Sequence, residues 1–241
     1  MMDELLIINI IRFVVGFGIL SYASFTDIKT RRAPNILWII MGGLGVILLL
    51  IQFFSPQGFG SQTLYLIFIP IMIAMVYLFF QMRLIFGGAD AKALMALAIL
   101  VPITPSINSY PLFESVMPFS WVIFSNSIVL FLVIPLSLLF YNIYKKNLMF
   151  PHCLFGYMIS VKKAKESFVW PIEKIVDGKR KLVKMPKSFD IDAELAEFEK
   201  YGIKKIWVTP KVPFMIPLLA GFITAFLIGD LLMLVMQYIV S

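Results

Sequence analysis

Cysteine and histidine are almost absent from this chain. Its 241 residues include one cysteine, Cys153, and one histidine, His152. A single cysteine excludes an internal disulfide framework and a paired-cysteine zinc site. His152 has no companion ligands at the spacing that metal sites use. We therefore expect no metal and no cofactor.

Charged residues are also scarce. They make up 15% of the chain, whereas hydrophobic residues make up 60% and the mean hydropathy is +0.91. Soluble domains are closer to half apolar. Apolar runs of about 20 residues, the length that crosses a bilayer, recur along the chain. The first run lacks a small-residue cleavage site, so we expect it to be retained. The composition predicts an all-α polytopic membrane protein in contact with the lipid bilayer.

Six transmembrane helices are expected from the positions of these runs. A proline pair after the fourth should stop that helix, and Pro135 should kink the fifth. The predicted spans are residues 5–26, 35–54, 62–82, 91–102, 119–142 and 212–238. No internal repeat is evident. We accordingly expect a membrane domain over 1–142, a soluble domain over 143–211, and a sixth helix within 212–241 that completes the membrane domain.

The long connection before the last helix has the pattern of a small α+β domain. Residues 190–202 form an acidic amphipathic stretch that Gly202 should end. Residues 179–186 and 204–210 read as strands bounded by proline. This domain is predicted to lie between the fifth and sixth transmembrane helices.

The distribution of basic residues predicts the orientation in the membrane. Residues 145–210 hold 14 Lys or Arg against 8 Asp or Glu, and the first and third loops are basic as well. The second and fourth loops carry only Glu114. Basic loops stay cytoplasmic, so both termini should lie outside the cell membrane and the large loop inside. Arg12 is expected to reach water at the outer end.

The basic excess fits anionic lipid headgroups. Binding to nucleic acid would need a clustered basic face or a recognisable module, and neither is present.

Ionisable groups at membrane depth are costly and mark functional sites. Four carboxylates lie outside the large loop and beyond the first span's interior: Asp27, Asp90, Glu114 and Asp230. Glu114 should be solvated in an outer loop, and Asp230 should be a structural hydrogen-bonding group. Asp27 ends the first helix and Asp90 begins the fourth. The topology places these two at the same cytoplasmic face.

Two neighbouring carboxyl groups do not both ionise readily, so one keeps its proton near neutral pH. The ionised group can then take a proton from water while the other donates to a carbonyl oxygen, as in aspartic proteases. Two alternatives, in which the aspartates have only structural roles, remain open. Asp90 could be an N-cap, and Asp27 could simply pair with Lys29 or Arg31.

Three segments carry a resemblance to a known family. FGGADAK (Phe86–Lys92) resembles the GxGD motif of intramembrane aspartyl proteases. DIKTRRAPN (Asp27–Asn35) resembles the stretch after the first helix of type IV prepilin peptidases. KKIWVTPKVPFMIP (Lys204–Pro217), together with the six-helix layout, resembles the archaeal preflagellin peptidases. The resemblance covers nearly the whole chain.

The resemblance implies that Asp27 and Asp90 are the catalytic aspartates. It also implies supporting roles for six motif residues: Gly87, Gly88, Ala89, Lys92, Pro34 and Asn35. Ala89 stands where the literal motif has glycine, and it is still small. Gly87 and Gly88 are expected to let the third loop approach substrate or to adopt positive φ.

By the same resemblance, the protein would remove a short basic leader from a preflagellin or prepilin substrate at the cytoplasmic membrane face. Bacterial relatives add a paired-cysteine zinc segment and a methyltransferase activity. One cysteine cannot supply that segment, so peptidase activity alone is expected.

Three other classes compete with this interpretation. A signal-peptide-peptidase or presenilin-like protease would carry a late PAL motif, which is absent. A proton-coupled transporter would place acids near the midplane and show paired repeats. A non-enzymatic membrane assembly subunit would tolerate replacement of its acids. The sequence leaves the oligomeric state and the individual preproteins open.

Overall fold

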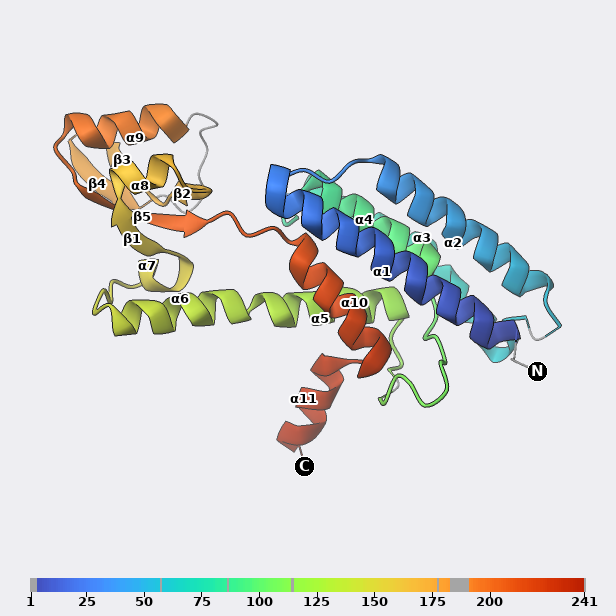
Figure 1. The fold of residues 1–241 in the computed structure, drawn as a ribbon. Helices are drawn as coiled ribbons and strands as arrows, with labels where there is room; N and C mark the ends of the chain where they lie inside the picture. Colours follow the sequence, from blue (N-terminus) through green and yellow to red (C-terminus); the bar gives the residue numbers. More distant parts are fainter. Residues whose placement is uncertain are drawn as a thin grey trace. The chain divides into compact units, whose positions relative to one another are not determined.

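A computed structural model describes residues 4–56, 58–85, 87–113, 115–176, 178–182 and 191–240. Phe86, Glu114 and residues 183–190, on which parts of the predictions fall, lie outside the described residues. The chain packs as two compact units, drawn in Figure 1. The first combines Met1–Phe131 with Pro213–Ser241, and the second is Leu132–Val212. The domain limits expected at residues 142 and 211 stay a prediction.

The first unit is entirely helical apart from its loops and isolated bridges in the described part. The chain runs through long helices α1 and α2, a 3-10 segment η1 that continues as α3, and then α4 and α5. After the second unit it returns through α10 and α11. The bounds are α1 Glu4–Thr30, α2 Ile36–Phe54, η1 Gly60–Ile67, α3 Phe68–Gln81, α4 Gly88–Leu100, α5 Phe119–Phe131, α10 Met215–Leu227 and α11 Leu231–Val240.

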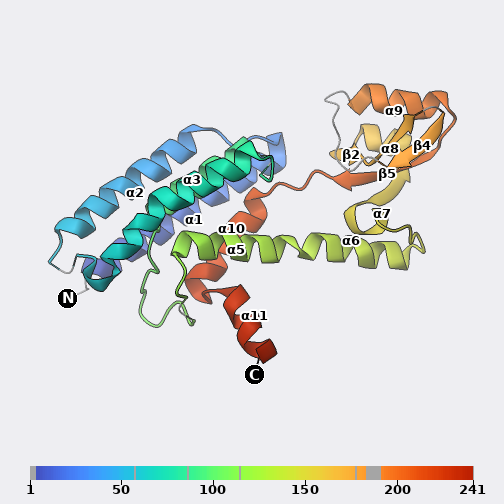
Figure 2. The same ribbon diagram turned by 180° about the vertical axis from the view of Figure 1, so that it is seen from behind.

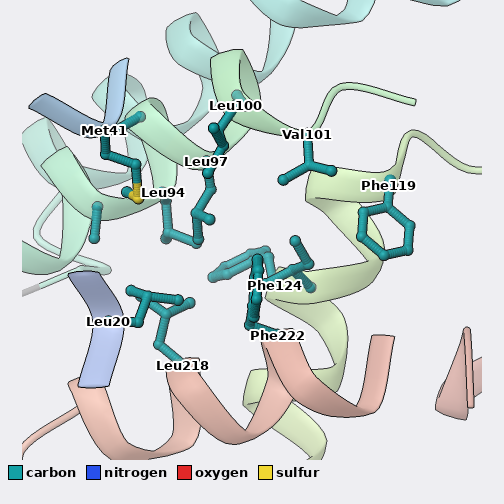
Figure 3. Packing of buried hydrophobic residues seen from close by; sticks show 14 of the residues in the cluster. Leu20, Met41, Leu94, Leu97, Leu100, Val101, Phe119, Phe124, Leu218 and Phe222 are labelled. Atoms are coloured by element: carbon teal, nitrogen blue, oxygen red, sulfur yellow. The ribbon is translucent and has the colours of Figure 1, made fainter. Parts of the chain in front are cut away.

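Helix α4 is the centre of this unit. It lies alongside α1, α2 and α3, as Figures 1 and 2 show from opposite sides. A helix that is hydrophobic all round is a buried one, and small side chains let its neighbours approach. Leu94 and Leu97 meet Leu20, Met41 and Phe222 in the core drawn in Figure 3. The alanines of α4 that are buried are Ala91, Ala93, Ala96 and Ala98.

Four helical segments of the described chain are long and apolar enough to cross a membrane: Glu4–Thr30, Ile36–Phe54, Gln62–Gln81 and Phe119–Tyr144. The apolar helix α10 is shorter. Helix α4 has 13 residues, so it extends about 20 Å, less than the roughly 30 Å of a bilayer core. The chain is thus mostly helical with helices of membrane-spanning length, and the six-span arrangement stays a prediction.

The helix predicted over 119–142 is interrupted at Leu132, between α5 and α6 (Val133–Tyr144). The break agrees with the disturbance expected from Pro135. A proline ring conflicts with the carbonyl four residues earlier, here that of Phe131, and removes one helical N–H.

The helix predicted over 212–238 was wrong as a single element, because it breaks between α10 and α11. Gly229 has φ +103 at the break. A Cβ there would lie 1.9 Å from the carbonyl oxygen of Phe113, so only glycine fits. The amide of Asn126 donates to the carbonyl of Gly229 over 2.8 Å and accepts the N–H of Leu231 over 3.0 Å. Contacts with distant residues therefore replace the helical hydrogen bonds.

Asp230 begins α11 as a hydrogen-bonding group. Its Oδ1 accepts the N–H groups of Leu232 and Met233, and its Oδ2 accepts the hydroxyl of Ser115 over 2.8 Å. These bonds satisfy helix N–H groups that have no partner within the helix. They support the structural role expected for Asp230.

The prediction that Arg12 reaches water is wrong, because its side chain is buried. Its side chain is 2% exposed, and Nη1 donates to Oδ1 of Asn9 over 3.3 Å. Asn9 in turn donates to the carbonyl of Ser106 over 3.1 Å. The local sequence gave no sign of this loop contact, because Ser106 lies 97 residues from Asn9. Polar groups at membrane depth usually face the protein interior in this way.

The second unit confirms a small domain with strands and helices. After α6 come α7 (His152–Phe155), α8 (Val161–Lys165) and α9 (Ile191–Lys200). Strands β1 (Tyr157–Ser160), β5 (Lys205–Pro210) and β2 (Val169–Pro171) form an antiparallel sheet in the order β1-β5-β2. Strands β3 (Glu173–Val176) and β4 (Lys179–Leu182) form a separate hairpin. Leu195 and Phe198 of α9 pack in one core with β5, as the amphipathic pattern predicts.

Gly45 allows α2 and α4 to pack closely. A Cβ at Gly45 would lie 2.9 Å from the backbone N and Cα of Leu100. Gly45→Ala should force the helices apart and lower stability by about 1–3 kcal/mol, the usual effect of overpacking. The thermal midpoint of the detergent-solubilised protein measures this effect. Gly43→Ala is the control, since a Cβ there meets nothing within 4 Å. Equal midpoints for the two variants would contradict the packing argument.

Candidate active site

Asp27 lies in the last turn of α1. The N–H of Arg31 donates to the Asp27 carbonyl over 3.0 Å, and Arg31 adopts φ +57 as the chain leaves the helix. The Asp27 carboxylate accepts the backbone N–H of Met215, the first residue of α10, and also feels the charge of Arg31. The side chain is therefore held between the end of one helix and the start of another.

Asp90 lies in the first turn of α4, where a negative charge suits the helix dipole. The N-cap is Gly87, so the alternative that Asp90 is the N-cap is wrong. The Asp90 side chain folds back over Gly87. A Cβ on Gly87 would lie 2.0 Å from Oδ2 and 2.7 Å from Cγ of Asp90. Glycine at position 87 thus leaves the space that the Asp90 carboxyl group occupies.

The glycine pair does not use the positive φ that was considered from sequence. Gly87 has φ −89 and ψ 114, which other residues adopt freely, and Gly88 begins the helix. A Cβ on Gly88 would meet only the Phe80 ring, at an ordinary 3.8 Å. Of the two positions, only 87 requires glycine for steric reasons, because the Asp90 side chain occupies the space of a Cβ there.

Asp27 and Asp90 belong to the same packed unit. The charge of Asp27 acts on the carboxyl group of Asp90, although 63 residues separate them in sequence. Burial in the protein strengthens such an interaction, because little water screens it. Two carboxyl groups in this relation can act as a proton donor and a proton acceptor.

Lys92 and Asn35 connect the two segments that carry the aspartates. Asn35 occupies the N-cap position of α2, but its side chain makes no capping bond. Instead its Oδ1 accepts Nζ of Lys92 over 2.9 Å. The carbonyl of Pro34 accepts the N–H of Leu37 as α2 begins. Ala89 is half-buried and packs against the core. The supporting roles expected for the six motif residues stay a prediction.

Among the described residues no group of three or more His, Cys, Asp or Glu side chains could hold a metal. His152 and Cys153 are buried in the second unit, where the His152 ring lies 5.5 Å from that of Trp207. Their environment is that of core residues.

Two residues of this site were missed by sequence reasoning. Met215 contributes its backbone N–H to Asp27. Ser24 donates its hydroxyl to the Met215 carbonyl over 3.0 Å. Backbone groups carry no residue-specific signal, and Ser24 is 191 residues from its partner. The only available sign was the KKIWVTPKVPFMIP segment, which contains Met215.

Two family models match this chain. The sequence model of the Type IV leader peptidase family matches residues 14–141, a range that contains both aspartates. That of the Archaeal Peptidase A24 C-terminus Type II matches residues 147–231.

Three curated proteins named preflagellin peptidase are similar over 91% of this chain. That of Methanococcus voltae is 29% identical, over 96% of its own length. Those of Methanococcus maripaludis strain C6 and Methanocaldococcus jannaschii are both 27% identical, over 96% and 94% of their lengths. With more than half of its residues matched by the first family model, this chain belongs to the Type IV leader peptidase family.

Proposed function

We propose that this protein is an aspartic endopeptidase of the cell membrane that removes a short basic leader from preflagellins or related prepilin-like proteins. The observation that carries the proposal is the pair Asp27 and Asp90, whose charges interact within one unit. The similarity to proteins named preflagellin peptidase supports the choice of substrate.

The proposed chemistry uses the two carboxyl groups in opposite protonation states. The ionised one removes a proton from a water molecule, which attacks the carbonyl carbon of the scissile peptide bond. The protonated one donates its proton to the carbonyl oxygen, and a tetrahedral intermediate forms. Collapse of this intermediate breaks the C–N bond, the leaving nitrogen takes up the proton of the pair, and one hydroxyl group of the intermediate gives its proton to the other carboxylate. The products are a carboxylic acid and an amine, and the pair recovers its single proton.

The positions of the aspartates suit a cut at the membrane surface. Asp27 lies in the last turn of an apolar helix of membrane-spanning length, and Asp90 in the first turn of α4. A substrate helix could remain in the bilayer while its polar leader reaches cytoplasmic water. The bond between leader and helix would then lie at the depth of the two carboxyl groups.

A cleavage assay tests the proposal. The purified protein in detergent is incubated with a preflagellin, and the masses of the products are measured by mass spectrometry. We expect one cut, between the basic leader and the hydrophobic helix. A cut inside the hydrophobic helix would instead indicate a signal-peptide-peptidase-like enzyme. No cut, together with proton-coupled flux in proteoliposomes, would indicate a transporter.

The orientation inferred from the basic loops is a separate prediction. Cys153 is the single cysteine of the chain, so a Cys153→Ala background has no competing thiol. A single cysteine at Ser109, in the fourth loop, should react with an impermeant reagent added outside intact cells. One at Lys162 should react only after the membrane is opened, because the basic segment 145–210 should stay cytoplasmic. Both positions are exposed in the structure. Labelling of both from the same side would contradict the proposed orientation.

A further inference from the structure

Asp27 and Ser24 both contact a single residue of α10. The backbone N–H of Met215 donates to the Asp27 carboxylate, and the Met215 carbonyl accepts the hydroxyl of Ser24 over 3.0 Å. We propose that Ser24 is a positioning residue, which fixes the first turn of α10 so that Met215 holds the Asp27 carboxyl group in its reactive geometry. The inference rests on the proposed function and adds a third element, α10, to the site.

The spacing on α1 makes this two-point attachment possible. Ser24 and Asp27 are three residues apart, so their side chains project from one face of the helix. Both reach Met215, which is 1% exposed, and Ser24 itself is 6% exposed. In this buried setting a hydrogen bond has little competition from water, and its direction is well defined.

The N–H of Met215 is a natural partner for a carboxylate. Met215 is the first residue of α10, and the first N–H groups of a helix have no partner within it. The same helix end carries a partial positive charge. Asp27 therefore satisfies a buried donor while Met215 orients the carboxyl group. Each group depends on the other staying in place.

The first turn of α10 needs an anchor because it is a helix end. Strand β5 of the second unit ends at Pro210, and α10 begins at Met215. Terminal turns of helices fray more readily than their interiors. The Ser24 hydroxyl ties this turn to α1 by a bond that does not involve the reacting group. Without it, rotation of the first turn would carry the Met215 N–H away from Asp27.

The test compares Ser24→Ala, Ser24→Thr and Ser24→Val in the cleavage assay. Threonine and valine have the same shape and differ by the hydroxyl, so this pair separates the hydrogen bond from packing. We expect Ser24→Ala and Ser24→Val to lower kcat about tenfold at unchanged KM, as for a misplaced reacting group. Ser24→Thr should retain most of the activity.

Two controls isolate positioning from general stability. The hydroxyl of Ser21, one turn earlier on α1, is buried and hydrogen-bonds nothing described in the structure, so Ser21→Ala should leave kcat unchanged. Ser115→Ala removes the hydrogen bond to Asp230, which joins two distant segments of the same unit. It should lower the thermal midpoint as much as Ser24→Ala while leaving kcat unchanged. A purely structural role for Ser24 would make these two variants alike in both measurements.

Asp27→Asn in the same assay separates the two proposals. If it still cleaves, the proposed aspartic mechanism is wrong. If it is inactive and Ser24→Val cleaves as fast as Ser24→Thr, the proposed function stands and the positioning role of Ser24 is wrong. Should alanine prevent accumulation of folded protein, the threonine and valine variants decide the question, compared at equal amounts of monodisperse protein.

Discussion

Asp27→Asn and Asp90→Asn should each abolish most of the cleavage of a preflagellin. Asparagine keeps the shape of the side chain and cannot exchange the proton. Positioned acid–base catalysis contributes about 10²–10⁴ in rate, so a fall of about that size is expected in kcat. Because the two carboxyl groups act as a unit, the double variant should be no slower than the slower single one. Initial rates with purified, folded protein measure this.

Asp230→Asn is the matched control, since it makes the same chemical change at a buried aspartate elsewhere in the first unit. Asp230 accepts hydrogen bonds at the start of α11, and asparagine is also a good helix cap. This variant should cleave at close to the wild-type rate. Near-wild-type cleavage by either Asp27→Asn or Asp90→Asn would remove the catalytic assignment. The pair should also give a pH–rate profile with two limbs, as coupled groups lose their protons in two steps.

Gly87→Ala should strongly lower the rate of cleavage, because the new methyl group would overlap the Asp90 carboxyl group. The added Cβ would lie 2.0 Å from Oδ2 of Asp90, far inside van der Waals contact, and the carboxyl group would have to move. A displacement of about 1 Å at a reacting group can cost about 10²-fold in rate. We therefore expect kcat to fall by at least that order while the protein still folds and inserts.

Gly88→Ala tests whether position 87 is special. Its added Cβ would touch only the Phe80 ring at 3.8 Å, and alanine is the better helix former. Its kcat should stay within a few-fold of wild type. If both alanine variants are fully active, the turn is a simple connector and a methyl group at position 87 does not displace the Asp90 carboxyl group. If both are inactive, the glycines serve substrate approach and not only the Asp90 side chain.

Much of the molecule follows from local sequence patterns. Long apolar runs predict the helices because hydrocarbon leaves the backbone no partner outside the segment. The pattern of Leu195 and Phe198 predicts α9, and the apolar stretch within residues 204–210, bounded by proline, predicts β5. Asp27 and Asp90 could be selected because carboxylates are rare in an apolar chain. The predicted topology then puts both at one membrane face.

Other features depend on partners far away in sequence. The break before α11 requires Phe113 and Asn126, which approach Gly229 only in the folded chain. Arg12 turns inward, where Oδ1 of Asn9 accepts its Nη1 and the Asn9 amide in turn donates to the carbonyl of Ser106. Asn35 has the residue type of a helix cap, but its side-chain oxygen accepts a hydrogen bond from Lys92 instead. Local propensity is worth about a kcal/mol or less per residue, so such tertiary contacts override it.

Sequence alone predicts the apolar helices, the mixed helix and strand content of the second unit, and the two candidate aspartates. Each of these rests on composition or on a periodicity within one segment. The packed structure was needed to find that Gly87 leaves space for the Asp90 carboxyl group and that Met215 contacts both Asp27 and Ser24. The reason is physical. Nearly every residue has the same backbone N–H group, so the sequence does not mark the one that binds a carboxylate. The lack of a side chain at a glycine matters only once the folded chain shows which group fills the space.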